Sequence, residues 1–208
     1  MVSADDGRPL APMEMHFKTA LGVLSTRDPA PPDLPHLDQI LPTMECSQSW
    51  GLGKPLLHVI DREADSVDYF RQWDAGKHKF LVRGDDRRVK WEKRYYLMSE
   101  ISKTLGGRKQ FREAGEAIYK GNVARLWVAE TSVVLDRPAK KNVKGKRFQR
   151  AGRALHMRLI VAQVRGTTGT VLAEWLLLSN APGEWATAEE LARCYYWRWQ
   201  IEDRKSVV

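Results

Sequence analysis

One stretch near the start of the chain constrains the fold more than any other. The continuous apolar run Pro55 to Ile60 predicts a strand buried on both faces. Residues 64–73 follow with the apolar period of an amphipathic helix, and residues 79–83 predict a second short strand. Strand, helix and strand in so short a stretch are typical of a parallel β-α-β unit. We therefore expect an α/β fold.

Two segments carry candidate functional side chains. Asp61 directly follows the first strand, which we expect to lie centrally in the sheet, and α/β folds place their sites at the carboxyl edge of such strands. Far along the chain, Tyr195, Arg198 and Glu202 are spaced three and four residues apart. At helical pitch this spacing puts a phenol, a guanidinium and a carboxylate on one face.

Two carboxylates from distant segments suit divalent-metal chemistry on a phosphodiester. Asp61 and Glu202 are the candidate catalytic residues and metal ligands, and Mg²⁺ or Mn²⁺ is the expected ion because it prefers oxygen donors. Arg198 has two alternatives, since it can bind a phosphate or pair with Glu202. Asp61 can equally cap a helix N-terminus, and Tyr195, Trp197 and Trp199 can be core aromatics.

The rest of the chain predicts several further elements. Val2 to Leu10 predicts a hairpin turn, residues 13–24 a strand, and the Pro-rich residues 27–42 an extended connection. Residues 84–182 predict a mostly β insertion. Its strands are expected at 124–134, 156–164 and 170–178, the last two joined by a hairpin at 166–169. The final helix opens with a capping box, Thr187 with Glu190.

The charge of the chain favours a polyanionic partner. The formal net charge is +8, and the segment 137–150 holds seven Lys and Arg residues and no acid. We expect this segment to be a loop at the tip of the insertion. A solvated loop and a loop that contacts phosphates are compatible readings. The candidate DNA-binding residues in it are Lys140, Lys141, Lys144, Lys146, Arg147 and Arg150.

Other functional classes find little support. Cys46 and Cys194 lie in no zinc or redox spacing, which favours free thiols in a reducing cytoplasm. The five histidines form no metal spacing. No apolar run is long enough to span a membrane and residues 1–10 contain no signal segment, so we expect a soluble cytoplasmic protein.

Three motifs together resemble one family. Asp61-Arg62-Glu63-Ala64-Asp65 is similar to a D-R-E-x-D segment, and Trp175 to Asn180 (WLLLSN) is similar to a W-L-L-L-T strand. Tyr195-x2-Arg198-x3-Glu202 matches the start of a Y-x2-R-x3-E-x6-K signature. These three patterns are typical of the DDE transposases of the insertion sequence 4 type, which the chain therefore resembles. The opening hairpin resembles the second-strand hairpin of that family.

The resemblance implies a fold and its domain organisation. Residues 1–83 would be part of an RNase H-like core, a mixed sheet with flanking helices whose first strand is missing. Residues 84–182 would be the β-rich insertion, and residues 183–202 the core helix that carries the catalytic Glu.

The resemblance also implies a mechanism. Water attacks at the transposon end, and the released 3′-hydroxyl later attacks target DNA, with two metal ions. Asp61 and Glu202 would hold metal, Tyr195 and Arg198 would contact phosphate, and Trp175 would stack on a flipped base. Arg62 and Trp199 are further candidate DNA contacts.

The sequence departs from the family pattern at both ends. The first catalytic Asp belongs on a strand before the opening hairpin, and the signature Lys would fall one position beyond Val208. We therefore expect a truncated, catalytically inactive fragment. Residues 203–208 (DRKSVV) match what a common short-read sequencing adapter would encode, so we hypothesise that they are a sequencing artefact.

Three functions remain open from the sequence. The first is a fragment of a DNA transposase that acts on double-stranded DNA, both transposon ends and target, as a homodimer on DNA when full length. In the bacterial cell it would associate with the nucleoid. The second is a DNA nuclease of the same fold without strand transfer. The third is a non-catalytic DNA-binding remnant.

Overall fold

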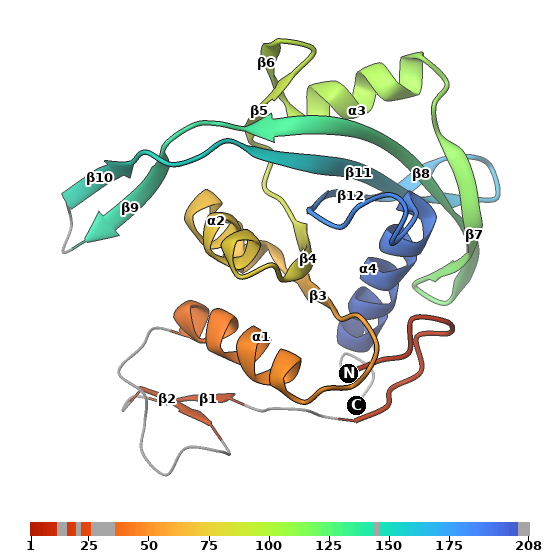
Figure 1. Ribbon diagram of the computed structural model, residues 1–208. Helices are drawn as coiled ribbons and strands as arrows, with labels where there is room; N and C mark the ends of the chain where they lie inside the picture. Colours follow the sequence, from red (N-terminus) through yellow and green to blue (C-terminus); the bar gives the residue numbers. More distant parts are fainter. Residues whose placement is uncertain (12–15, 20–21, 26–35, 144–145, 204–208) are drawn as a thin grey trace.

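The chain forms an α/β fold in which helices flank a mixed, mostly antiparallel sheet (Figure 1). The computed structural model describes residues 1–11, 16–19, 22–25, 36–143 and 146–203. Within them, the side chains of residues 16–19, 22–25, 36, 140–143, 146–148 and 199–203 lie outside the description. No helix among the described residues has the length and apolar character needed to cross a membrane.

The predicted β-α-β unit is confirmed. Strand β3 (Leu57–Ile60) runs parallel to β4 (Lys79–Arg83), with helix α2 (Val67–Ala75) between them in sequence. The helix begins three residues later than predicted, because the 3-10 turn η2 (Arg62–Ala64), Asp65 and the extended Ser66 precede it. The inward positions Phe70 and Trp73 are fully buried, as the apolar period predicts.

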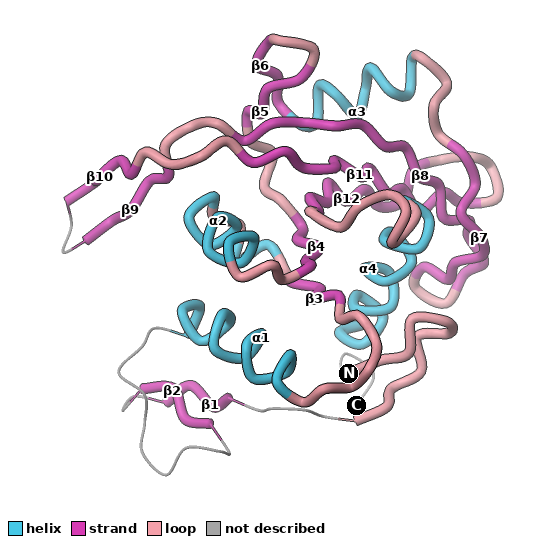
Figure 2. The backbone as a smooth tube through the Cα atoms, in the orientation of Figure 1, coloured by secondary structure: helices cyan, strands magenta, loops and turns pink. Residues whose placement is uncertain are grey.

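One sheet contains most of the strands. Its order is β3-β4-β12-β11-β8-β5-β6, with β7 paired to β8 (Figure 2). The further strands are β5 (Arg88–Trp91), β6 (Arg94–Leu97), β7 (Arg112–Tyr119), β8 (Asn122–Leu135), β11 (Leu155–Gly166) and β12 (Val171–Ser179). Apart from β3 with β4, its pairs among the described residues are antiparallel. Because β12 pairs with β4, the predicted insertion continues the sheet of the first segment.

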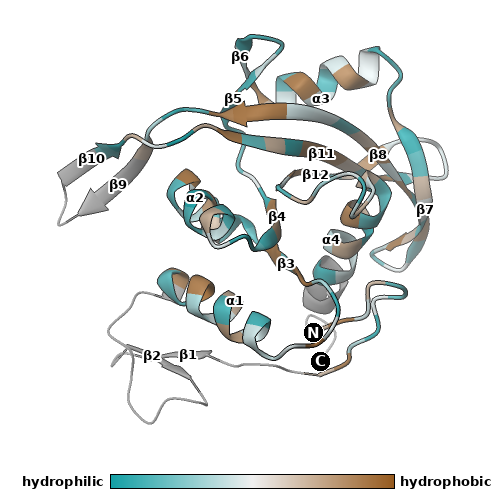
Figure 3. Ribbon diagram, in the orientation of Figure 1, coloured by the Kyte–Doolittle hydropathy of each residue, from teal (hydrophilic) through white to brown (hydrophobic). Residues whose placement is uncertain are grey.

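The sheet is buried on both faces by helices. Along β11 the side chains alternate, so that Leu159 and Val161 belong to one apolar cluster and Ile160 to the other. Helices α1 (Ile40–Ser49), α2 and α3 (Met98–Gly107) cover the first face, and α4 (Ala188–Asp203) covers the second. Figure 3 shows the resulting apolar colouring along the central strands. The core therefore has two layers with the sheet between them.

Strand β3 differs from the prediction in its position. It pairs with β4 alone among the described strands, so it lies at an edge of the sheet instead of at its centre. Its four residues are half-buried, not buried on both faces. The prediction was wrong because an apolar run reports local composition, whereas strand order depends on which segments pair. The fully buried run is instead Phe80 to Val82 of β4.

The N-terminal segment also differs from the prediction. In place of one strand over residues 13–24, the structure has the antiparallel pair β1 (His16–Thr19) and β2 (Gly22–Ser25). The opening hairpin is confirmed by the bridge between Val2 and Pro9. The prediction of an extended connection over residues 27–42 is wrong for residues 36–42, which form the 3-10 turn η1 (His36–Gln39) and the start of α1. Residues 27–35 lie outside the described residues. Pro42 fits the first turn of α1, where a backbone N–H has no helical partner.

Two elements of the β-rich region were not predicted. Helix α3 interrupts it, and Met98, Ile101 and Leu105 on its inner face are buried at spacings of three and four. The segment predicted as a basic loop contains a two-stranded hairpin, β9 (Ala139–Val143) with β10 (Lys146–Arg150). Basic residues dominate both strands and apolar ones are few, which is why the sequence alone suggested a loop.

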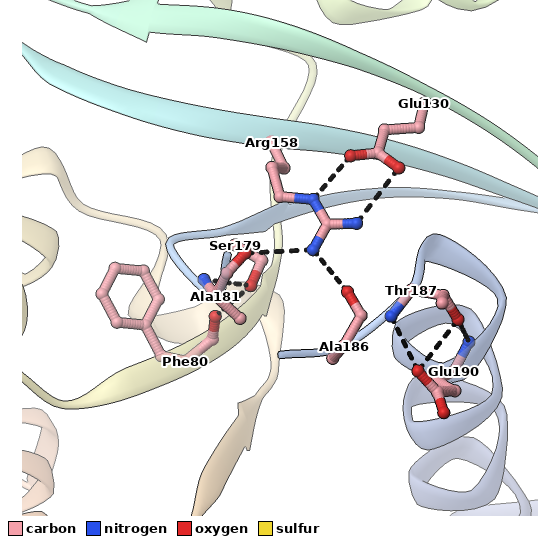
Figure 4. Close-up of polar contacts among 8 residues, drawn as sticks. All are labelled: Phe80, Glu130, Arg158, Ser179, Ala181, Ala186, Thr187 and Glu190. Carbon is pink, nitrogen blue, oxygen red and sulfur yellow. Dashed lines mark hydrogen bonds and ion pairs between the residues drawn. The ribbon is translucent and has the colours of Figure 1, made fainter. Parts of the chain in front are cut away.

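Two devices hold the start of α4. The predicted capping box is present, because the N–H of Thr187 donates to Glu190 Oε2 at 2.7 Å and the N–H of Glu190 donates to Thr187 Oγ1 at 3.2 Å. Just before the helix, Arg158 of β11 donates to both carboxylate oxygens of Glu130 and to the carbonyls of Ala181 and Ala186 (Figure 4). These bonds fix the loop that leads into α4, and thereby the direction of the helix.

Candidate functional site

Asp61 and two residues of α4 meet at the carboxyl end of β3. The Tyr195 hydroxyl donates to Asp61 Oδ1 at 3.2 Å, and an Arg198 guanidinium nitrogen lies 3.1 Å from the same oxygen. The same nitrogen of Arg198 also donates to the Tyr195 hydroxyl at 3.4 Å. The two segments are 134 residues apart in the chain. The structure thus brings together three of the residues that the sequence selected.

The core determines where the Tyr195 ring lies. Tyr195 is fully buried, and its ring meets that of Trp175 edge to face with centroids 5.3 Å apart. The Arg198 guanidinium lies 5.2 Å from the Tyr195 ring centroid on the next turn of the helix. The spacing of three residues places both side chains on the same face of α4, toward β3. Only the hydroxyl of Tyr195 reaches the polar site.

The carboxylate of Asp61 is stabilised in its charged form. Burial opposes ionisation, but the N–H of Arg62, the Arg198 charge, the Tyr195 hydroxyl and the Arg83 charge outweigh it, and the pKa of Asp61 falls below its usual value. Burial raises the pKa of Tyr195, so that its hydroxyl remains a donor. Asp61 is therefore an ionised carboxylate, stabilised by two guanidinium charges and two hydrogen-bond donors.

Arg83 is a member of the site that the sequence interpretation missed. It ends β4 directly beside β3, since Ile60 pairs with Val82, and its charge acts on both Asp61 and Tyr195. The sequence contained a signal for it. In a parallel pair of strands, residues at matching positions lie side by side, so Arg83, which follows Val82, lies beside Asp61, which follows Ile60. The register, which only the structure supplies, was needed to use it.

Glu202 remains the untested member of the predicted site. The backbone of α4 extends through it to Asp203, but the side chains of Glu202 and Trp199 lie outside the described residues. Among the described side chains Arg198 pairs with Asp61, and its predicted pairing with Glu202 lies outside the described side chains. The metal role of Glu202 stays a prediction from spacing.

Two other predicted contacts lie away from this arrangement. Trp175 is only 3% exposed within the core beneath Tyr195, so it presents no open ring face on which a base could stack. Arg62 is exposed and lies 3.4 Å from Asp85, on the solvent side of the turn after Asp61. The burial of Trp175 follows from its place on a strand whose alternate side chains face α4.

The basic hairpin lies at the opposite end of the sheet from α4 (Figure 1). Arg150 is exposed and lies 3.5 Å from Asp68 in the first turn of α2. The side chains of Lys140, Lys141, Lys146 and Arg147, and all of Lys144, lie outside the described residues. Their role as DNA contacts stays a prediction.

The donor chemistry at Asp61 suits a divalent cation. The Asp61 side chain is 42% exposed, it is ionised, and its contacts with Tyr195 and Arg198 engage Oδ1. A hard carboxylate oxygen at an accessible sheet edge is a usual magnesium or manganese ligand. Among the side chains that the structure describes, no three His, Cys, Asp or Glu residues gather into a metal-binding group. A complete metal site would need further oxygen donors beside Asp61.

The N-terminal hairpin packs beside the same helix. Gly7 lies against the Trp197 ring so closely that an added Cβ would be 2.4 Å from it, and its φ of +70° also favours glycine. Asp5 and Asp6 lie in the turn of this hairpin, where Asp6 Oδ1 accepts the N–H of Arg8. They are turn residues, as the sequence indicates.

Comparison with known proteins adds no assignment: no family model matches the chain, and no curated protein matches it.

Proposed function

We propose that the chain is part of a DNA transposase of the DDE type, with an RNase H-like core that catalyses metal-dependent strand cleavage and strand transfer at transposon ends. The observation that carries the proposal is the convergence of Tyr195 and Arg198 on Asp61. These residues belong to two separate motifs of the resemblance. An ion pair on the surface of one helix, or an aspartate that caps a helix, would not require these two distant segments to meet.

Each described residue has a role in this proposal. Asp61 supplies a carboxylate at the sheet edge, and Arg198 and Arg83 supply positive charge beside it for a DNA phosphate. Tyr195 orients the Asp61 carboxylate through its hydroxyl. Because Tyr195 is fully buried, its proposed contact with a phosphate oxygen requires the phosphate to displace Asp61 from that hydroxyl. Because Arg198 now contacts Asp61, we expect phosphate and carboxylate to share this guanidinium when DNA binds.

Asp61 and Glu202 would hold Mg²⁺ or Mn²⁺, which when bound supplies Lewis-acid activation of the phosphodiester. The exposure and ionisation of Asp61 support this. The family reaction uses three acids, and the sequence supplies two at matching positions. We therefore propose that the 208 residues alone do not cleave DNA.

The proposed partner is double-stranded DNA, as transposon ends and target, bound by a homodimer of the full-length protein. The net charge of +8 and the basic hairpin β9–β10 support a polyanionic partner. Lys140, Lys141, Lys144, Lys146, Arg147 and Arg150 are the proposed contacts of the hairpin with the backbone of the DNA.

A cleavage and strand-transfer assay tests the proposal. The protein is expressed from the source gene with its flanking coding sequence and given DNA that carries the element's ends, with Mg²⁺ or Mn²⁺. Asp61→Asn and Glu202→Gln are expected to lower cleavage at least a thousandfold, by analogy with removal of a positioned catalytic group. Glu184→Gln, which neutralises an exposed acid in the loop before α4, is the matched control and should cleave normally.

The same assay separates the alternatives. Metal-dependent nicking without any joined product would favour a nuclease of the same fold. Salt-dependent DNA binding without cleavage would favour the non-catalytic remnant. Normal cleavage by the Asp61→Asn variant would remove Asp61 from the active site and overturn the proposal.

A further inference from the structure

Strand β3, which leads into Asp61, has few contacts of its own to hold it. It has four residues, lies at an edge of the sheet and pairs with β4 alone among the described strands. Its residues are half-buried, and Asp61 itself is the N-cap residue of the short turn η2. A group that binds metal or phosphate has to be held within about 0.5 Å of its working position. The position of Asp61 therefore depends on what holds the turn that follows β3.

The far end of that turn carries a buried carboxylate. The Asp65 side chain is 1% exposed, and its Oδ2 accepts the N–H of Asp85 at 2.7 Å and lies 2.7 Å from a guanidinium nitrogen of Arg87. The same nitrogen of Arg87 donates to the carbonyl of Asp65 at 2.7 Å. Asp65 Oδ1 is buried and has no hydrogen-bond partner among the described residues, so Oδ2 carries these side-chain contacts. We call the contacts of Asp65 with Asp85 and Arg87 the Asp65 clasp.

The Asp65 clasp joins two loops at the carboxyl edge of the sheet. Residues 61–65 follow β3, and residues 84–87 follow β4, which is parallel to β3. The second loop is anchored in the sheet, because the N–H of Gly84 donates to the carbonyl of Leu176 on β12 at 2.7 Å. It is also anchored on α3, since the N–H of Met98 donates to the carbonyl of Arg87 at 3.1 Å. The clasp thus ties the Asp61 turn to a loop that is fixed at both ends.

The turn itself connects this anchor to Asp61. The N–H of Ala64 donates to the carbonyl of Asp61 at 3.2 Å, and the N–H of Asp65 donates to the carbonyl of Arg62 at 3.0 Å. Ala64 is buried in the core. The ion pair of Arg62 with Asp85 also spans the two loops, but both side chains are exposed and such a pair holds little. The buried link between the two loops is the Asp65 clasp.

The energetics of the clasp favour fixed geometry over net stability. Burial, with a smaller effect from the charge of Asp85, raises the pKa of Asp65, and the charge of Arg87 and two hydrogen bonds lower it. In a buried ion pair the cost of desolvation offsets much of the attraction. Hydrogen bonds to an ionised group are short and directional. What the clasp supplies is therefore mainly the placement of one loop against the other.

We propose that Asp65 is a positioning residue for Asp61: through Asp85 and Arg87 it holds the Asp61 carboxylate where Tyr195 and Arg198 meet it. The inference rests on the proposed function for the role of Asp61 as a metal ligand, but the clasp stands on its own contacts. Asp65 acts through Asp61 and touches neither metal nor DNA. Its loss should therefore weaken the uptake of metal more than it slows cleavage at saturating metal.

Amide hydrogen exchange of the 208-residue chain tests whether the clasp holds the turn. Asp65→Ala should speed exchange at the N–H of Ala64 about tenfold and leave that of Leu159, in the centre of the sheet, unchanged. Arg87→Ala should have the same effect, and the double variant should add little to either, because both remove one clasp. Asp68→Ala is the matched control. It removes another largely buried acid, which pairs with Arg150 in the first turn of α2, and should leave Ala64 unchanged.

Cleavage by the protein with its flanking sequence tests the consequence for the site. Asp65→Ala should raise the Mn²⁺ concentration for half-maximal cleavage about tenfold, as the loss of a residue behind a metal ligand does. The rate at saturating Mn²⁺ should fall much less. The Mn²⁺ affinity, measured from the electron paramagnetic resonance of free Mn²⁺, should weaken by the same factor. Asp65→Asn keeps an acceptor oxygen and should show a smaller change. Val164→Ala lowers stability from within the core of β11 and should leave the Mn²⁺ requirement unchanged.

Circular dichroism and urea unfolding establish that each variant is folded, and Asp65→Asn and Arg87→Ala carry the comparison if Asp65→Ala is not. Unchanged exchange at Ala64 would overturn the inference. An unchanged Mn²⁺ requirement, or an equal increase in Val164→Ala, would overturn it as well. If the unmodified protein does not cleave, or if Asp61→Asn cleaves normally, the proposed function fails instead. The exchange experiment then still decides whether Asp65 holds the Asp61 turn.

Discussion

The Tyr195 hydroxyl donates to the carboxylate of Asp61 across 134 residues of sequence, while the ring that carries it is fully buried against Trp175. One side chain thus belongs to the core and to the candidate site at once. Removing the ring and removing the hydroxyl should therefore lower the free energy of unfolding by different amounts.

Tyr195→Phe should lower the free energy of unfolding by about 1 kcal/mol, because it removes one hydrogen bond and keeps the packing. Tyr195→Ala should lower it by about 3 to 5 kcal/mol, because it leaves a cavity beside Trp175. Urea unfolding of both variants checks the difference. Equal losses would show that the ring contributes little to the core.

The charges around Asp61 should be visible in its titration. Arg198→Gln should raise the pKa of Asp61, and Arg83→Gln should raise it less, because Arg198 contacts the carboxylate and Arg83 acts through a smaller charge effect. NMR titration of the Asp61 carboxyl carbon measures both. Arg62→Gln is the control, since that side chain lies beside Asp85 and only its backbone N–H acts on Asp61. If Arg62→Gln raised the pKa of Asp61 more than Arg198→Gln does, Arg62 would carry the dominant charge.

The stability of the fold should depend on pH through His58. Burial, then the charge of His78, lowers the pKa of His58 from 6.5 to about 4 in the folded protein. The unfolded chain binds the proton first, so the stabilisation is complete above pH 6.5 and is lost as the pH falls toward 4. The loss should be on the order of 3 kcal/mol. His58→Asn should flatten the pH dependence of the free energy of unfolding, measured with urea, in this window. An unchanged pH dependence would show that other groups cause it.

The bonds of Arg158 predict a large effect far from the candidate site. Arg158→Met should lower the free energy of unfolding by about 3 kcal/mol, because Glu130 loses its partner and the carbonyls of Ala181 and Ala186 lose their donor. The double variant Glu130→Gln/Arg158→Met should lose less than the sum of the two single variants. Additive losses would show that the pair is not coupled.

The contact between Gly7 and Trp197 should control how the N-terminal hairpin packs. Gly7→Ala adds a Cβ that clashes with the ring at a φ of +70°, whereas Gly169→Ala has a similar φ of +80° and nothing within 4 Å. Hydrogen exchange should therefore speed up at Ser3 and Leu10, whose N–H groups bond within the hairpin, only in the Gly7 variant. Unchanged exchange at Ser3 and Leu10 in the Gly7 variant would show that the contact with Trp197 does not control the packing of the hairpin.

Much of the architecture could be predicted because it is local. The apolar period of α2, the strand-helix-strand order of residues 55–83 and the Thr187 capping box each involve residues within a few turns of one another. Helix α3 was local too, but it lies within residues 84–182, which were predicted to be mostly β. The many basic residues of the β9–β10 hairpin suggested a solvated loop and so concealed its strand pairing.

The sequence by itself determined which residues could form a site: Asp61 after a strand, and Tyr195, Arg198 and Glu202 on one face of a helix. Only the tertiary structure decided that Arg198 pairs with Asp61, that Arg83 joins them, and that Trp175 is covered. The reason is physical. Helical spacing and caps depend on neighbours in the chain, whereas strand register, burial and the partner of a charge depend on which distant segments pack together.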